Sequence, residues 1–166
     1  MGTVDIVTKE YMRENAIFAD AFNYLIYGGK KVIDPAGLTE IDTATSAVGK
    51  KDALQKYRDV LKAAVIKQDE KMSYVLLGVE NQMEVHYAMP VRNMVYDALQ
   101  YDKQVAMIAA DNRRNKRFSS GTMRNNGEFL SGFLRTDKIL PVITLTLYFG
   151  TEPWDGPLSL LSLIHI

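Results

Sequence analysis

YVLLGVENQ, at residues 74–82, has the pattern of a buried strand that ends in polar side chains. Side chains alternate across a strand, so Glu80 and Gln82 point to the same face. Upstream, KYRDVLKAAVI at residues 56–66 carries a lone carboxylate, Asp59, among aliphatic neighbours. We expect the two stretches to pair as a hairpin across the polar turn between them, which would place Asp59 beside Glu80.

Helical periods and turn residues predict the remaining elements. Asn15 can cap a helix that ends at Gly28 and Gly29. Pro90 opens a long helix that continues to about Asp111. The other predicted elements are a strand at residues 38–43, a short helix or strand at 128–133 and a strand at 139–149.

The order of these elements is helix, strand, strand, strand, helix, strand. A hairpin combined with a helical crossover predicts an α/β fold with a mixed sheet flanked by helices. In the first helix, Asp20 and Asn23 fall on the stripe opposite the apolar one. In the long helix, the residues at apolar helical spacing are Val91, Met94, Val95, Ala98, Val105 and Ala109.

The bulk composition is that of a soluble protein with one domain. The 166 residues are 47% hydrophobic and 24% charged, and twenty acidic and twenty basic side chains give a formal net charge of zero. The absence of cysteine excludes disulfides, thiolate catalysis and thiolate zinc sites. His86 and His165 lack metal-ligand spacing, which argues against a zinc site or a His-dependent triad. A charged start and the lack of a membrane-length apolar stretch predict a cytoplasmic location and no membrane partner.

Asp59 and Glu80 are the candidate metal ligands. Hard cations such as Mg²⁺ prefer oxygen ligands, usually one or two carboxylates together with waters and phosphate oxygens. Such an ion can polarise a phosphoryl oxygen and lower the pKa of a bound water. Gln82 has no charge, but its amide could orient the attacking water or the scissile phosphate. The set points to metal-dependent phosphodiester hydrolysis, although a charged residue at a strand end is also typical of a solvated edge or a salt bridge.

Other polar residues are further candidates. Asp20 could add a carboxylate to the metal site, or it could be an ordinary charge on the helix surface. Arg92 and Tyr96, one turn apart, could contact a phosphate or could join helix to sheet through a buried salt bridge. A basic segment could contact DNA phosphates or could be a solvated loop. Its cations are Arg113, Arg114, Lys116, Arg117 and Arg124.

The pattern of Asp59 followed on the next strand by Glu-x-Gln resembles the core of PD-(D/E)XK nucleases. The flanking sequence is similar to the recombination-promoting nuclease and transposase (Rpn) family. The similar segments are spread over roughly residues 8–158 and comprise IFADAFNYLIY, KYRDVLK, LLGVENQ, AMPVRNMVYDALQY and LPVITLTLYFG followed by WDGP.

The resemblance implies a restriction-endonuclease-like fold and a bacterial enzyme that cleaves DNA with Mg²⁺ or Mn²⁺. It implies that Asp59 and Glu80 bind the metal, that Gln82 assists catalysis, and that the role concerns DNA recombination or mobile elements. Two positions depart from the broader superfamily: Arg58 replaces a proline, and Gln82 replaces a lysine that would stabilise a developing oxyanion. The alternative is a catalytically inactive DNA-binding or protein-interaction module that keeps the nuclease fold.

The nuclease-like domain is expected to cover residues 1–158. Residues 159–166 form an apolar tail that resembles translated adapter sequence, and we interpret this tail as a truncated, non-native end. Because a double-strand cut needs two active sites or two successive events, the sequence is compatible with a homodimer.

Overall fold

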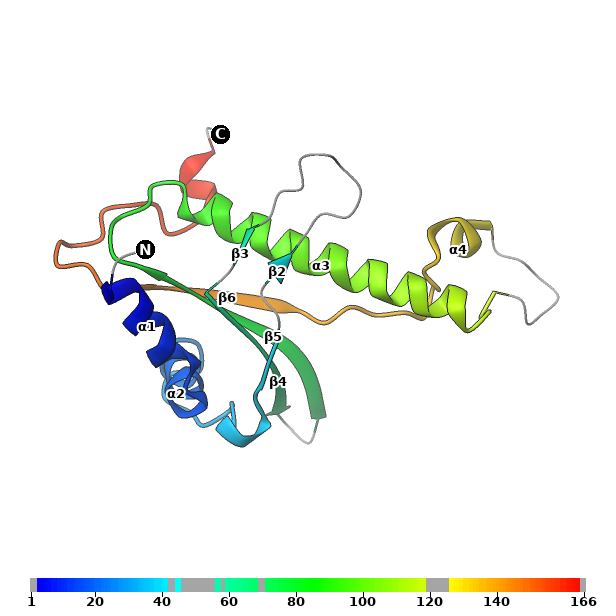
Figure 1. The fold of residues 1–166 in the computed structure, drawn as a ribbon, viewed down its shortest axis with the longest axis horizontal. Helices are drawn as coiled ribbons and strands as arrows, with labels where there is room; N and C mark the ends of the chain where they lie inside the picture. Colours follow the sequence, from blue (N-terminus) through cyan, green and yellow to red (C-terminus); the bar gives the residue numbers. More distant parts are fainter. Residues whose placement is uncertain are drawn as a thin grey trace.

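A four-stranded sheet organises the molecule. The computed structural model describes residues 3–41, 44–45, 56–57, 59–68, 71–118 and 126–164. The strands lie in the order β1-β4-β5-β6 (Figure 1). Their bounds are Thr39–Glu40 for β1, Val60–Gln68 for β4, Lys71–Gln82 for β5 and Val142–Tyr148 for β6. A separate two-stranded sheet joins β2, Ala44–Thr45, to β3, Lys56–Tyr57.

The main sheet combines antiparallel and parallel pairs. β4 and β5 form the predicted antiparallel hairpin, with Val60 opposite Val79. β6 runs parallel to β5, with Thr146 opposite Glu80, and a long helix makes the crossover between these two strands. The predicted mixed α/β sheet flanked by helices is therefore confirmed, whereas the restriction-endonuclease-like fold stays a proposal.

Helices cover both faces of the sheet (Figure 1). α1 (Thr3–Arg13) and α2 (Asn15–Leu25) lie on the first face, and α3 (Met89–Arg114) runs along the second. The remaining described elements are α4 (Asn126–Ser131), η1 (Pro35–Gly37) and η2 (Leu160–Leu163). No helix in the described parts of the chain is both long and apolar enough to cross a membrane.

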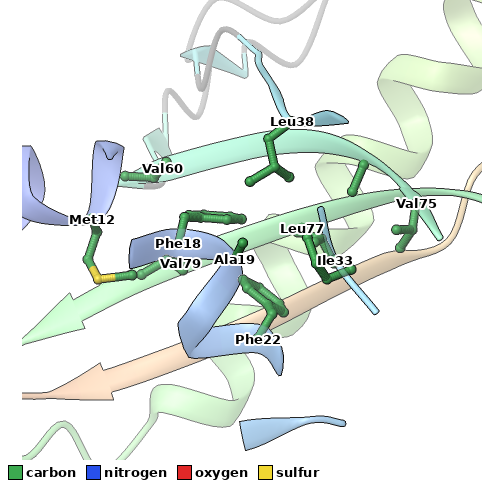
Figure 2. Packing of buried hydrophobic residues seen from close by; sticks show 11 residues of the cluster. Met12, Phe18, Ala19, Phe22, Ile33, Leu38, Val60, Val75, Leu77 and Val79 are labelled. Carbon is green, nitrogen blue, oxygen red and sulfur yellow. The ribbon is translucent and has the colours of Figure 1, made fainter. Parts of the chain in front are cut away.

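The apolar core lies between α2 and the first face of the sheet. Alternate side chains of β5 point toward the buried rings of Phe18 and Phe22, whose centroids are 5.0 Å apart (Figure 2). These β5 residues are Val75, Leu77 and Val79. Because successive side chains of a strand point to opposite faces, Glu80 and Gln82 lie on the second face, toward α3.

Polar contacts join α3 to β6 on this second face. The Asn93 side chain donates from Nδ2 to Thr146 Oγ1 at 2.9 Å, and Thr144 Oγ1 donates to Asp97 Oδ1 at 2.6 Å. The threonines of β6 therefore face a polar side of α3.

The predicted helical period of the apolar residues at 91–109 is confirmed by α3, but most of them are not on its buried side. Val91, Met94 and Val105 are 38%, 48% and 38% exposed. Tyr96 and Gln100 are buried instead, together with Ala109, the one member of the predicted stripe that is fully covered.

Two asparagines of α2 also differ from the prediction. Glu14 rather than Asn15 is the N-cap, and Asn15 accepts a hydrogen bond from Lys62 Nζ at 2.6 Å. Asn23, expected on the outer stripe, is buried. The predicted glycine stop follows α2, with positive φ at both glycines. α1 was not predicted, and of its described side chains Met12 alone is buried.

Candidate active site

The two candidate carboxylates lie at the same level of the β4–β5 hairpin. Asp59 immediately precedes β4, and continuing the register by one residue from the Val60–Val79 pair places it opposite Glu80. Asp59 Oδ2 accepts a hydrogen bond from the backbone N–H of Asn81 at 2.8 Å. Where the strand pairing ends, this carboxylate takes the place of the backbone carbonyl that accepts the hydrogen bond in a regular sheet.

Glu80 and Gln82 share the second face, as the alternation predicts. Gln82 Nε2 donates to Glu80 Oε1 at 3.4 Å. The first turns of α3 bring Arg92 to the same oxygen, with Arg92 Nη2 at 2.6 Å from Glu80 Oε1. The side chain of Glu80 is only 2% exposed and that of Arg92 is 33% exposed, so the ion pair closes over the carboxylate from the solvent side.

Tyr96 holds the other edge of the guanidinium. Arg92 Nε donates to Tyr96 Oη at 2.8 Å, which fixes the direction in which the remaining N–H groups point. Helical spacing alone placed Arg92 and Tyr96 on one stripe, and the structure brings that stripe to the carboxylates.

The charges of this group act on one another. Burial alone would lower the pKa of Arg92, but the hydrogen bond to Tyr96 and the charges of Glu80 and Asp59 outweigh burial and raise that pKa above its ordinary value. Burial also raises the pKa of the Tyr96 phenol; the hydrogen bond to Arg92 opposes this rise, and the two carboxylates add to it. At neutral pH the site therefore contains a cationic Arg92 and a neutral Tyr96.

Two residues near the carboxylates were not among the site residues predicted from the sequence. Lys9 extends from α1, with Nζ at 4.0 Å from Asp59 Oδ1. Asn81 is 5% exposed, and both polar atoms of its side chain lack a hydrogen-bond partner among the described residues. Lys9 could have been found only by predicting α1, and Asn81 only by treating the polar end of β5 as buried.

Asp20 lies apart from this group. It is exposed on α2 and borders a hollow together with Lys31 and Asp34, whereas Glu80 and Arg92 lie on the opposite face of the sheet. The structure does not bring Asp20 to the two carboxylates. Within the described residues, no group of three or more His, Cys, Asp or Glu side chains could hold a metal ion.

The basic cluster is also distant from the carboxylates. Arg113, Arg114, Lys116 and Arg117 lie at or just beyond the C-terminal end of α3, and Arg92 lies near its start. Arg58, Arg124 and His165 lie outside the described residues.

The oxygen atoms of this site could bind a hard cation only if the substrate and solvent supplied further ligands. Asp59 and Glu80 offer carboxylate oxygens and Gln82 offers an amide oxygen, which are the atom types that Mg²⁺ prefers. Two carboxylates match a site completed by waters and phosphate oxygens. Arg92 competes for Glu80 Oε1, so metal and guanidinium must share the Glu80 carboxylate.

The fold and this site define a mixed α/β protein with a carboxylate pair at one end of a hairpin. Comparisons of the chain with family models, curated proteins and solved structures found no match.

Proposed function

We propose that the chain is a Mg²⁺- or Mn²⁺-dependent DNA endonuclease of the Rpn type, with a role in DNA recombination or mobile elements. The observation that carries this proposal is that Asp59 accepts a hydrogen bond from the backbone N–H of Asn81, next to Glu80, while Gln82 and Arg92 are bonded to one oxygen of Glu80. The resemblance of several segments to the Rpn family supports it independently.

In this mechanism Asp59 and Glu80 would hold the metal. When bound, the ion supplies Lewis-acid polarisation of the scissile phosphate and activation of a water. Gln82 uses its amide to orient the attacking water or the phosphate. The backbone N–H of Asn81 fixes the Asp59 carboxylate in position.

Arg92 and Lys9 supply positive charge to this proposed site. Arg92 forms an ion pair with Glu80, and its planar donor fork can turn from the carboxylate to a substrate phosphate. Tyr96 limits that movement because it holds Nε. Lys9 lies beside Asp59 and offers an ammonium group in a site where Gln82 stands in place of the usual lysine.

Plasmid nicking with and without Mg²⁺ tests the proposal. Asp59→Asn and Glu80→Gln remove one charge each at nearly constant shape. Metal catalysis is worth several kcal/mol, and each 1.36 kcal/mol is a factor of ten in rate, so we expect each variant to lose about 100-fold or more in nicking rate. Glu84→Gln, at an exposed acidic residue next to the site, is the matched control and should nick at the wild-type rate.

The outcome that contradicts the proposal is equal nicking by all four proteins, which would point to a contaminating nuclease. Circular dichroism and thermal melting of each variant separate loss of catalysis from loss of fold. If nicked plasmid becomes linear only at high protein concentration, this result would support cleavage of the two strands by two copies of the chain.

A catalytically inactive module is the second candidate. The observation that favours it is that Asp59 and Glu80 both have structural partners, the N–H of Asn81 and Arg92. Titration calorimetry with Mn²⁺ separates the two functions. A nuclease requires metal binding that Glu80→Gln weakens, whereas an inactive module predicts no metal-dependent heat in either protein.

A further inference from the structure

A cavity of about 350 Å³ lies between the start of α3 and the second face of β6. Its walls include Asn93 from α3, Thr144, Thr146 and Tyr148 from β6, and Trp154 from the segment that follows β6. This volume falls within the usual range for small-molecule sites. The described residues that line it are uncharged.

The cavity adjoins the candidate active site. In the parallel β5–β6 register Thr146 lies opposite Glu80, and Tyr148 lies opposite Gln82. Neighbouring strands are about 4.8 Å apart, and paired residues project to the same face. A phosphate held at Glu80 would therefore have the cavity directly beside it.

Two aromatic rings form one wall. The centroids of Tyr148 and Trp154 are 5.2 Å apart with an interplanar angle of 74°. Trp154 Nε1 donates to the carbonyl of Gly156 at 2.8 Å. A methyl group at Gly156 would lie 3.2 Å from the indole, and one at Gly150 would collide with the Tyr148 phenol. The two glycines thus let the backbone close tightly on the rings, which fixes the aromatic wall.

Asn93 and Thr146 form the polar side of the cavity. The Asn93 Nδ2 donates to Thr146 Oγ1 at 2.9 Å and joins α3 to β6 beside the aromatic wall. The Asn93 Oδ1 is buried, so a ligand in the cavity does not reach it. The surface that the cavity offers to a flat ligand is therefore the aromatic wall.

We propose that this cavity binds the nucleobase next to the phosphate at the Glu80 site, with the base stacked on the Tyr148–Trp154 wall. A paired base inside a duplex cannot enter, so the ligand is a single-stranded or extruded base. This inference rests on the proposed nuclease function for the identity of the substrate, but base binding needs neither metal nor cleavage.

The uncharged, aromatic lining favours a base over an isolated ion. An inorganic anion would find no cation among the described lining residues, and a metal ion would find no carboxylate there. Stacking on aromatic side chains accepts every base, so the site should not select strongly among the four bases.

Fluorescence of Trp154, the single tryptophan of the chain, reports the binding directly. The protein in EDTA is titrated with each deoxynucleoside 5′-monophosphate and with deoxyribose 5-phosphate, which lacks a base. We expect saturable quenching by the nucleotides and an affinity at least about tenfold lower for the sugar phosphate, because stacking is lost. Tyr148→Leu removes one ring of the wall and should lower the affinity for every nucleotide. Tyr24→Leu, at an exposed tyrosine of α2, is the matched control and should bind as the wild type does.

Two results would overturn the base site. One is equal quenching by sugar phosphate and nucleotides, and the other is no saturable quenching of the wild type by any nucleotide. Both use the unmodified protein, so they do not depend on a variant that folds. Failure of the nuclease proposal gives a different result. Base-dependent quenching without Mg²⁺-dependent nicking would support the base site and contradict the nuclease proposal.

Discussion

At the scale of single residues, a buried amide fastens the segment after α2 to the core. Asn23 Oδ1 accepts from the backbone N–H of Val32 at 2.9 Å and of Ile33 at 2.8 Å. Its Nδ2 donates to the Ile33 carbonyl at 2.9 Å. One side chain thus satisfies three backbone groups that would otherwise be buried without partners, and it holds Ile33 in the apolar core.

Asn23→Ala should lower the free energy of unfolding by about 3 kcal/mol, because each unsatisfied buried polar group costs about 1–3 kcal/mol. Tyr24→Ala, at the neighbouring residue that is 74% exposed, should change it by less than about 0.5 kcal/mol. Urea unfolding followed by circular dichroism measures both. Equal effects of the two substitutions would mean that the Asn23 contacts do not stabilise the fold.

Tyr96 makes stability depend on pH in the alkaline range. Its folded pKa is raised above the ordinary value of 10.0, so its hydrogen-bonded phenol contributes stability below pH 10 that is lost as pH rises through the folded pKa. Tyr96→Phe should cost about 1–2 kcal/mol at neutral pH through the lost bond to Arg92. The difference between the two proteins should shrink above pH 10 in urea titrations. A constant difference across that range would contradict this assignment.

The residues of the candidate site were predictable to different degrees. Alternation along a strand was sufficient to place Glu80 and Gln82 on one face, and the hairpin added Asp59. Helical spacing could not say which side of α3 faces the sheet, so it left the roles of Arg92 and Tyr96 open. Lys9 was missed because α1 was not predicted, and among the described side chains of α1 only Met12 is buried.

At the scale of elements, strands were easier to predict than the orientation of α3. β4 and β5 carry apolar runs, and β6 alternates apolar residues with threonines, which are two patterns typical of strands. α3 instead faces the threonines of β6 with polar side chains, and much of its apolar stripe lies outward. A periodic pattern gives the helix, but the chemistry of the opposing strand selects the buried side.

This orientation predicts an unequal response to substitution. Met94→Lys should change the free energy of unfolding by less than about 0.5 kcal/mol, because Met94 is 48% exposed. Phe22→Ala should cost about 3–5 kcal/mol, because it empties a fully buried site in the core. Chemical denaturation of both variants checks the assignment. A large loss in Met94→Lys would show that the apolar stripe of α3 is covered after all.

At the scale of the whole molecule, α3 connects the carboxylates to the basic cluster. A rise of about 1.5 Å per residue separates Arg92 from Arg113 by about 30 Å along the helix axis. This is close to one turn of B-DNA, about 34 Å. A duplex lying along α3 with its scissile phosphate at Glu80 would therefore meet the basic cluster about one turn away.

The double variant Arg114→Gln/Lys116→Gln tests this arrangement of DNA. It avoids Arg117, which lies 3.8 Å from Asp111, and Arg113, which lies 3.5 Å from the Ser131 carbonyl. If both cations contact phosphates, affinity for a 30-base-pair duplex should fall, and the slope of log K against log salt should become shallower by about 2. The reason is that each lost phosphate contact releases about one counterion fewer.

A duplex too short to span α3 supplies the decisive comparison. Affinity for a duplex of about eight base pairs, bound only at the carboxylate end, should be the same for the wild type and the double variant. Lys30→Gln/Lys31→Gln removes the same charge just after α2 and should leave the salt slope for both duplexes unchanged. If the two double variants give the same salt slope on the long duplex, the basic cluster is a solvated surface, and DNA must approach the carboxylates by a path that does not follow α3.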